Sequence, residues 1–421
     1  MPIRSQAAAL EHVGDQGQPH ANGNCHGQDD GAEYKGFGEE HGGPLRRVDA
    51  VTLNCFEGVF TRDALRDRPT IGKGFTRGAI CGGRALLQMA HHQVRTPPHG
   101  SHTRSEMNVR RLGDGTPVGQ IALGAMAFSD FYAGRDDHAG VAAIHCALDA
   151  GITLIDTAEV YGMGHSETMV GKAVRDRRDQ AVIATKSIKG HPDYLRQAID
   201  RSLTHLGLDF VDLYYLHRVD QDVPIEESAG AMADLIAAGK VRAYGLSEAA
   251  ADNIRAAHAV HPVAALQTEY SLLERAPEVD LLPVTRELGI TFVAYSPLSR
   301  GLLTGTIRRE SDLEEADWRR NVPRFQSDNL AHNVALLAPL EHMATRLDTS
   351  PAAVAVAWLL GRGEDVIPLV GMGRPSSVAR ALDALDLHLT PDDVAALDAA
   401  FPIGAAAGTR YPEEMMSRVH V

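Results

Sequence analysis

Cysteine is scarce in this chain, and long hydrophobic runs are missing from it. Only four cysteines occur in 421 residues, without CxxC spacing, which argues against a disulfide framework or a structural zinc site and favours a reducing compartment. No run reaches the ~20 apolar residues that span a membrane. The first 16 residues also lack the apolar segment of a secretory signal. We therefore expect a cytoplasmic protein without a membrane partner.

An excess of basic residues is also missing, because the formal net charge is −14 at pH 7. Non-specific binding to nucleic acid requires a basic face, so nucleic acid is not an expected partner. With 44% apolar and 23% charged residues, the composition is that of a soluble globular protein. The length is about three times that of a typical domain, although α/β barrels often run past about 200 residues as one domain.

Residues 1–106 lack regular periodicity. They contain 8 of the 20 histidines and three of the four cysteines, and the stretch 14–44 follows neither a strand nor a helix period. Such a segment buries too little apolar surface to offset its chain entropy, so we predict a disordered extension. A metal-binding arm is the alternative, although the spacing of its candidate ligands matches no common site. These candidates are His20, Cys25, His26 and His41.

Met107 offers a second explanation for this segment. It opens MNVRRLGDGTPVG, which is typical of a natural start followed by a β-hairpin with a glycine-containing turn. In that case the start codon has been assigned too far upstream, and residues 1–106 are not part of the natural protein. Both explanations place the folded domain at 107–421.

Beyond Met107, short apolar runs alternate with amphipathic helical stretches. The strand candidates are 121–125, 152–155, 181–185, 211–216, 241–246, 264–267, 291–295 and 366–370. Helical patterns occur at 138–149, 166–176, 193–205, 226–238, 250–258, 277–288 and 351–361. Strict alternation of this kind indicates parallel strands joined by crossover helices.

Eight such units favour a closed (β/α)8 TIM barrel, an α/β fold, with an N-terminal β-hairpin in front of it. A doubly wound open sheet is the rival fold. It usually carries a GxGxxG motif after its first strand, and LGAMAFSD (123–130) contains none.

Four chemically active side chains follow consecutive predicted strands. In a barrel of this type, the carboxyl ends of the strands carry the chemistry. The second strand ends at Asp156, with Tyr161 in the loop beyond, and the third and fourth strands lead to Lys186 and His217. We therefore expect these four side chains to meet at one face of the barrel.

Proton transfer is the chemistry that this set supports. Tyrosine, with a pKa near ~10, transfers protons poorly at pH 7, and a neighbouring ammonium lowers that pKa. Lys186 can act in this way if Asp156 keeps it charged, while Tyr161 and His217 donate hydrogen bonds to a carbonyl oxygen that receives a hydride. The alternatives are a structural ion pair, a rim tyrosine and a structural histidine. The convergence of all four residues on consecutive strand ends favours an active site over these alternatives.

The chain resembles the aldo-keto reductases in motifs that cover nearly all of 107–421. The most specific is AYSPLSRGLLTG (294–305), which is similar to the YSPLxRGxLTG signature of the bacterial and plant branch. The other matching stretches are LIDTAEVYG (154–162), GHSE (164–167), IATKS (183–187), DLYYLHR (212–218), GLSE (245–248), LQTEYS (266–271) and the tail GTRYPEEMM (408–416).

The resemblance implies a catalytic tetrad and a nicotinamide cofactor. In the family, the positions that match Asp156, Tyr161, Lys186 and His217 form the tetrad, and the tyrosine is the general acid in carbonyl reduction. The resemblance also implies NADPH, in preference to NADH, held across the barrel mouth without a Rossmann domain. The positions that match cofactor-binding residues are Gly124, Ser247, Gln267, Tyr295, Ser296, Leu298, Arg300, Gly371 and Arg374.

By the same resemblance, Ser247 and Gln267 bind the carboxamide, and Tyr295 stacks on the nicotinamide ring. Ser296, Leu298 and Arg300 belong to the loop that folds over the pyrophosphate, where a guanidinium is well suited to pair with phosphate.

Two stretches depart from the family pattern. In GMGRPSSVARAL (371–382), Gly373 replaces the first basic residue and Ala381 replaces an expected asparagine. The grip on the ribose phosphate then rests on Arg374, with Arg380 as a second candidate. The loop SIKGHPDY (187–194) is shorter than usual, which predicts a more open substrate pocket.

The sequence therefore predicts an NADPH-dependent reductase of aldehydes or ketones, with a small-molecule carbonyl substrate as its partner and no particular oligomeric state indicated. The alternative is a slow-turnover NADPH sensor or partner-binding module on the same fold, like the potassium-channel accessory subunits of the family. A metal-dependent hydrolase is a third interpretation. It is disfavoured because only His217 stands at a strand end as a candidate ligand.

Overall fold

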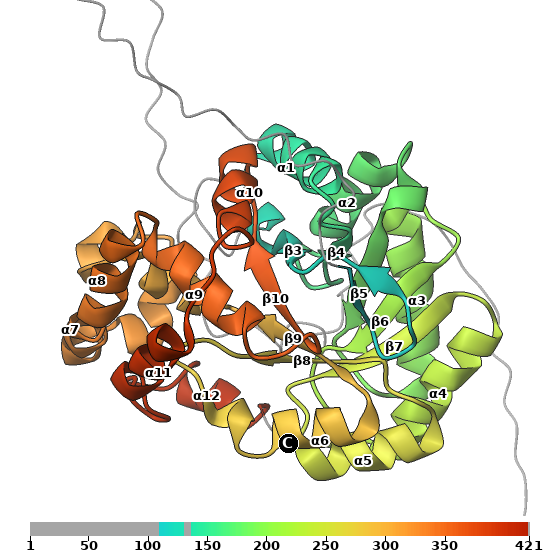
Figure 1. Cartoon of the computed structure of the whole chain (residues 1–421). Coiled ribbons are helices and arrows are strands. Elements are labelled where there is room, and N and C mark those ends of the chain that lie inside the picture. The colour runs from blue at the N-terminus through green and yellow to red at the C-terminus, as the bar shows by residue number, and fades with distance from the viewer. Residues whose placement is uncertain (1–108, 130–135, 420–421) are drawn as a thin grey trace, which may run out of the picture. The chain divides into compact units, whose positions relative to one another are not determined.

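The alternating apolar runs form eight parallel strands that close into a barrel (Figure 1). The computed structural model describes residues 109–129 and 136–419, so the predicted extension at 1–106 lies outside the described residues. The strands hydrogen-bond in the order β10-β3-β4-β5-β6-β7-β8-β9. Their bounds are β3 Ala122–Gly124, β4 Leu154–Asp156, β5 Val182–Ser187, β6 Val211–Leu216, β7 Val241–Ser247, β8 Ala265–Glu269, β9 Thr291–Tyr295 and β10 Val366–Gly371. The predicted (β/α)8 barrel is therefore confirmed.

The predicted N-terminal hairpin is also present. β1 (Arg110–Arg111) pairs antiparallel with β2 (Pro117–Val118). Leu112 and Val118 pack with the apolar side chains inside the barrel, and Gly113 N donates to Ala264 O at 2.9 Å. The hairpin therefore covers the end of the barrel at which the strands begin, opposite the predicted site.

Helices surround the barrel, and α7 and α8 lie beyond α9 (Figure 1). The crossover helices are α1 Asp137–Asp149, α2 His165–Val174, α3 Pro192–Leu206, α4 Ile225–Ala237, α5 Ala251–Val260, α6 Leu281–Leu288, α9 Pro351–Leu360 and α10 Pro375–Leu382. The sequence did not predict α7 (Ser327–Ala335), α8 (Ala338–Arg346), α10, α11 (Pro391–Ala400) or α12 (Glu413–Met416). None of the helices in the described part of the chain has the length and apolar character to cross a membrane.

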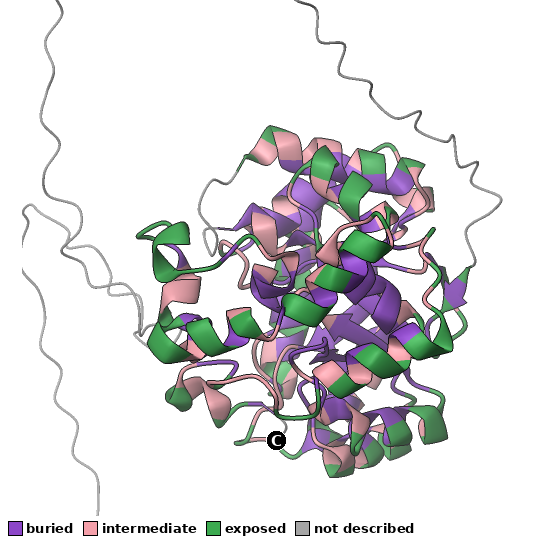
Figure 2. Ribbon diagram, turned by 60° about the vertical axis from the view of Figure 1, so that its left-hand side comes forward, coloured by how far each residue is buried: buried purple, intermediate pink, exposed green. Residues whose placement is uncertain are grey.

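Alternation along each strand creates two cores. Leu154, Ala184 and Leu213 face the barrel interior, whereas their neighbours Ile155 and Ile183 pack outward against the helices. Figure 2 shows the resulting pattern, with buried strands at the centre and exposed residues on the outer faces of the helices. Because side chains alternate with a period of two, the residues two positions further along each strand also point inward, at the barrel mouth.

Gly245 on β7 makes room for a large side chain inside the barrel. A Cβ atom at this position would lie 2.4 Å from Tyr215 Cε1 and 2.7 Å from Ala265 O. The ring of Tyr215 fills the space below the barrel mouth and is fully buried. A side chain at 245 would therefore have to displace this ring or the strand beside it.

Gly245→Ala should destabilise the fold by about 1–3 kcal/mol, the usual cost of overpacking a well-filled core. The matched control is Gly230→Ala on α4, where no atom lies within 4 Å of the added Cβ. That change should be neutral or stabilise the helix by up to ~1 kcal/mol. Urea unfolding of both variants measures the difference, and equal midpoints for the two would contradict the packing argument.

Candidate active site

Asp156, Tyr161, Lys186 and His217 come together at the carboxyl ends of the strands. Asp156 is the last residue of β4, Lys186 lies near the end of β5, and His217 directly follows β6. Tyr161 lies in the turn after β4, where its backbone N–H donates to Ala158 O at 3.0 Å. The backbone N–H of His217 donates to Ser187 O at 2.8 Å, which extends the strand pairing to the histidine.

A buried ion pair joins Lys186 and Asp156. The ammonium of Lys186 is fully buried and donates to one oxygen of the Asp156 carboxylate. It also donates to Thr157 O at 2.7 Å, while Gln267 Nε2 donates to the second Asp156 oxygen at 2.8 Å. Burial raises the pKa of Asp156 and lowers the pKa of Lys186, and the opposite charge of each partner counteracts both shifts.

Tyr161 lies between the ammonium and the histidine. Lys186 Nζ is 5.1 Å from the centre of the Tyr161 ring. The rings of Tyr161 and His217 meet edge to face, with their centres 5.9 Å apart at an interplanar angle of 85°. The four side chains thus form one contiguous group.

His217 is held as a neutral imidazole. Burial lowers its pKa well below the ordinary value, and the neighbouring charges of Arg218 and Lys186 lower it further. A neutral imidazole has one N–H donor and one acceptor nitrogen, so it can donate one hydrogen bond without changing its charge at pH 7.

The predicted cofactor positions surround this group. Ser247 and Gln267 stand opposite each other where β7 pairs with β8, and Gly124 stands opposite Gly371 where β3 pairs with β10. Tyr295 ends β9 and is partly exposed. Its hydroxyl group lies 2.9 Å from the Tyr411 hydroxyl.

The loop after β9 contains Ser296, Leu298 and Arg300, as the sequence predicts. The Arg300 guanidinium is buried and donates to Glu269 Oε2 at 2.8 Å. It also lies over the Tyr411 ring, 4.6 Å from the ring centre. A contact between Arg300 and a pyrophosphate stays a prediction, and it would require the guanidinium to leave Glu269.

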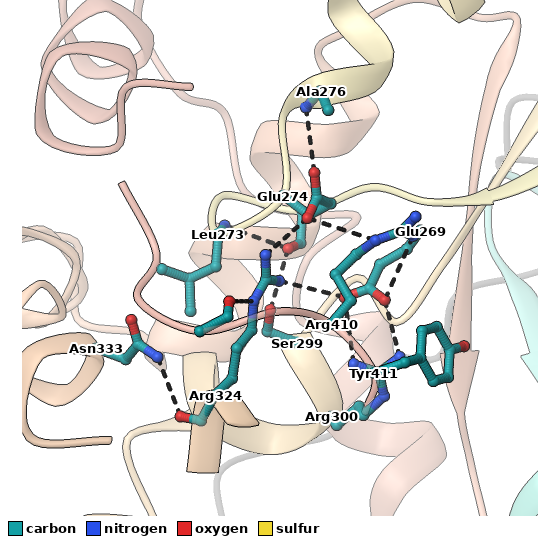
Figure 3. A network of polar contacts seen from close by, with 12 residues as sticks. Glu269, Leu273, Glu274, Ala276, Ser299, Arg300, Arg324, Asn333, Arg410 and Tyr411 are labelled. Atoms are coloured by element: carbon teal, nitrogen blue, oxygen red, sulfur yellow. Dashed lines mark hydrogen bonds and ion pairs between the residues drawn. The ribbon is translucent and has the colours of Figure 1, made fainter. Parts of the chain in front are cut away.

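Three arginines and three glutamates form a largely buried group at the barrel mouth, which we call the mouth network. Figure 3 labels all of its members except Glu248. Arg410 binds both oxygens of Glu248 at 2.9 Å, and Arg324 binds Glu274 at 2.7 Å. Arg410 also lies 3.7 Å from Glu269, which connects the pairs. The members are Glu248, Glu269, Glu274, Arg300, Arg324 and Arg410.

The ion pairs of this network and the contacts of Arg218 and Tyr411 were not predicted from the sequence. The matching motifs contain Glu248, Glu269 and Arg410, but pairs separated by 162 positions, such as Glu248 and Arg410, leave no periodic signal. Arg218 lies in the DLYYLHR motif directly after the candidate histidine. It donates to Tyr411 Oη at 3.3 Å. Its position next to His217 was the one sequence feature that could have indicated a role for Arg218 in the site.

Arg374 is exposed and directly precedes α10, close after the end of β10. The alternative residue Arg380, on α10, is also exposed and donates to Ser377 Oγ at 3.2 Å. Gly373 has a packing reason to lack a side chain, since its Cβ would lie 3.1 Å from Ala127 Cβ. A basic residue at this position would therefore crowd Ala127.

Two other features bear on the alternatives considered for this chain. The loop between β5 and α3 consists of residues 188–191. A more open substrate pocket beside this loop stays a prediction. Within residues 109–129 and 136–419, no group of three or more His, Cys, Asp or Glu side chains is arranged to hold a metal ion.

Comparison with known proteins identifies the family. The model of the aldo/keto reductase family matches residues 120–401, and the chain belongs to this family. The aldo-keto reductase yakc of Schizosaccharomyces pombe, whose name specifies NADP(+), is 36% identical over 327 residues, covering 74% of this chain and 96% of that protein. This chain is thus an aldo-keto reductase, and the family expected from the sequence is confirmed. Assignment to the bacterial and plant branch stays a prediction.

Solved structures of two relatives support the same fold. A glycerol dehydrogenase from Gluconobacter oxydans is 35% identical with a TM-score of 0.64, covering 69% of this chain and 94% of that one. An aldo-keto reductase from Klebsiella pneumoniae, solved in complex with NADPH, is 28% identical with a TM-score of 0.59, covering 73% and 99%.

The lowered pKa of His217 predicts a pH dependence of stability. Below about pH 6.5 an unfolded chain protonates this histidine and the folded chain does not, so stability falls as the pH falls. The slope from this one group is at most ~1.4 kcal/mol per pH unit. His217→Gln should therefore flatten the dependence of the unfolding free energy between pH 6.5 and 5. Urea titrations at several pH values test this, and parallel curves for both proteins would contradict a neutral buried His217.

Proposed function

We propose that this aldo-keto reductase reduces an aldehyde or ketone to an alcohol with hydride from NADPH, and that Tyr161 is the general acid. The observation that carries the proposal is the contact of Tyr161 with both the Lys186 ammonium and the His217 ring. Three consecutive strands supply these groups, at the end of the barrel where such folds place their chemistry.

The residues at the mouth fit a nicotinamide cofactor. Ser247 and Gln267 provide hydroxyl and amide groups at adjacent strand ends, which suits a carboxamide. At the end of β10, Gly371 has no atom within 4 Å of the position a Cβ would occupy, so a ligand can approach its backbone. Tyr295 offers a partly exposed ring for stacking. When bound, the reduced nicotinamide supplies the hydride.

Proton delivery is the task of the chain's own residues. Tyr161 donates its hydroxyl proton to the carbonyl oxygen as negative charge develops there, and the neutral His217 donates a second hydrogen bond to the same oxygen. The Lys186 ammonium stabilises the phenolate that remains. Asp156 holds the ammonium charged and in position, since an unpaired lysine in this buried place would tend to lose its proton.

NADPH is the proposed cofactor because an arginine stands where its extra phosphate is expected. The 2′-phosphate distinguishes NADPH from NADH, and the planar guanidinium of arginine can bind phosphate through two hydrogen bonds. Arg374 is exposed at the start of α10 and is therefore accessible to this group. The NADP(+)-specific name of the yeast relative and the NADPH complex of the Klebsiella relative support the choice.

Tyr161→Phe should lower the rate of carbonyl reduction by roughly 10²–10⁴-fold, because the change removes the proton donor and keeps the ring. NADPH binding should persist. Steady-state NADPH oxidation and quenching of protein fluorescence measure the two quantities.

Tyr194→Phe is the control for this variant, since it also removes one tyrosine hydroxyl, here one that donates to Glu159 at 3.1 Å outside the tetrad. It should turn over at the wild-type rate. A Tyr161→Phe enzyme that keeps wild-type turnover at neutral pH would rule out Tyr161 as the acid.

Arg374→Ala should weaken NADPH binding by the ~1.5–3 kcal/mol of a charged hydrogen bond and leave NADH binding nearly unchanged. Arg380→Ala, on the helix that Arg374 directly precedes, is the matched comparison. Dissociation constants of both cofactors, measured by fluorescence quenching, distinguish the two arginines. Equal losses for NADPH and NADH, or no loss, would show that Arg374 does not select the phosphate.

A further inference from the structure

Arg218 makes no ion pair with any carboxylate of the described residues. Its guanidinium donates to three neutral oxygens, which are His217 O at 2.6 Å, Ser247 Oγ at 3.4 Å and Tyr411 Oη at 3.3 Å. Among residues 109–129 and 136–419, no carboxylate forms an ion pair with it, and the side chain is only partly exposed to solvent.

The nearby carboxylates are already engaged. Glu248, which directly follows Ser247, binds Arg410 through both of its oxygens. Glu269 binds Arg300 (Figure 3). The mouth network thus pairs three arginines with three glutamates. Arg218 stands next to this network as a fourth arginine, and no carboxylate in the described part of the chain forms an ion pair with it.

An unpaired and partly buried cation costs desolvation energy that neutral acceptors recover only in part. The fold nevertheless holds this guanidinium in a defined place. The carbonyl of His217 fixes one side, and the Tyr411 ring lies 5.8 Å from the guanidinium carbon. The two contacts with hydroxyl groups are long, at 3.3 and 3.4 Å, so an incoming anion can replace them at little cost.

The position of Arg218 connects it to the reacting carbonyl group. It directly follows His217 and donates to Ser247 Oγ at 3.4 Å. Ser247 stands opposite Gln267, which donates to Asp156. A carboxylate that pairs with Arg218 would therefore lie at the same end of the barrel as a carbonyl group held by Tyr161 and His217. The fork of donors on arginine matches a carboxylate through two parallel hydrogen bonds.

The cofactor does not account for this cation. The part of NADPH expected beside Ser247 is the carboxamide, which is neutral. Its phosphates are expected at the loop after β9 and at Arg374. With the cofactor in these places, the substrate is the other bound molecule that can supply an anion to Arg218.

We propose that Arg218 binds a carboxylate of the substrate, so that the preferred substrates are short aldehydes or ketones with a carboxylate within a few bonds of the carbonyl group. This inference rests on the proposed carbonyl reduction. Arg218 is then a specificity-determining residue, since it selects acidic over neutral carbonyl compounds without taking part in hydride or proton transfer.

Matched substrates test the inference in the wild-type enzyme. The pairs are 4-oxobutanoate against its amide and 2-oxobutanoate against butanone. In at least one pair, kcat/KM should be about tenfold or more higher for the acid, mainly through a lower KM, and the preference should decrease as salt is added. Equal kcat/KM values within both pairs would overturn the inference. If no carbonyl compound is reduced at all, the proposed function itself fails, which is a different result.

Variants of Arg218 identify the residue responsible. Arg218→Gln should reduce the ratio of kcat/KM for the acid to that for its neutral partner by about 10- to 100-fold, the range expected for a lost charged hydrogen bond. Arg218→Lys should retain part of the ratio. Arg255→Gln, an exposed arginine on α5 that pairs with Glu287, is the control and should keep the wild-type ratio.

Two results would contradict the role of Arg218. An unchanged ratio in Arg218→Gln would place the anion elsewhere. A weakened dissociation constant for NADPH with an unchanged ratio would assign Arg218 to the cofactor. If Arg218→Gln does not fold, as judged by thermal unfolding, the ratio in Arg218→Lys decides, and complete retention of the wild-type value would overturn the inference.

Discussion

The buried ion pair of Lys186 and Asp156 is the interaction on which the candidate site depends. Removing one partner of such a pair typically costs about 3–5 kcal/mol, because the other charge stays buried without compensation. The pair is fixed from two sides, by Thr157 O and by Gln267, which reaches Asp156 from β8, a strand that is not a neighbour of β4. The geometry of the tetrad therefore depends on closure of the whole barrel.

The mouth of the barrel is built from charges that satisfy one another. The network of Glu248, Glu269 and their arginines joins the ends of β7 and β8 to the loop after β9 and to the C-terminal segment. Tyr411, next to Arg410, then reaches the hydroxyl of Tyr295. Residues far apart in the chain thus hold the aromatic ring proposed to stack on the nicotinamide. Among the described residues, Arg218 lies beside this network without an ion pair, and this is the observation behind its proposed role in substrate binding.

The strands and the placement of the tetrad could be predicted from the sequence, because they depend on hydrophobic periodicity and on position along the chain. The bounds of β6 and β9 match the predicted 211–216 and 291–295, and the inward period of two brings the tetrad to one face. α6 begins at Leu281 instead of 277, since a short 3₁₀ turn at Ala276–Glu278 precedes it. The partners of Arg300 and Arg410 could not be predicted, because they depend on which strand ends and loops meet in three dimensions.

A double-mutant cycle on Asp156 and Lys186 tests the central claim most directly. Hydride transfer would be measured in single turnovers for Asp156→Asn, Lys186→Met and the double variant. If the carboxylate acts by holding the ammonium, removing Asp156 should not lower the rate of hydride transfer further once Lys186 is absent. The double variant should then be about as slow as Lys186→Met alone. Losses that multiply independently in the double variant would contradict the account.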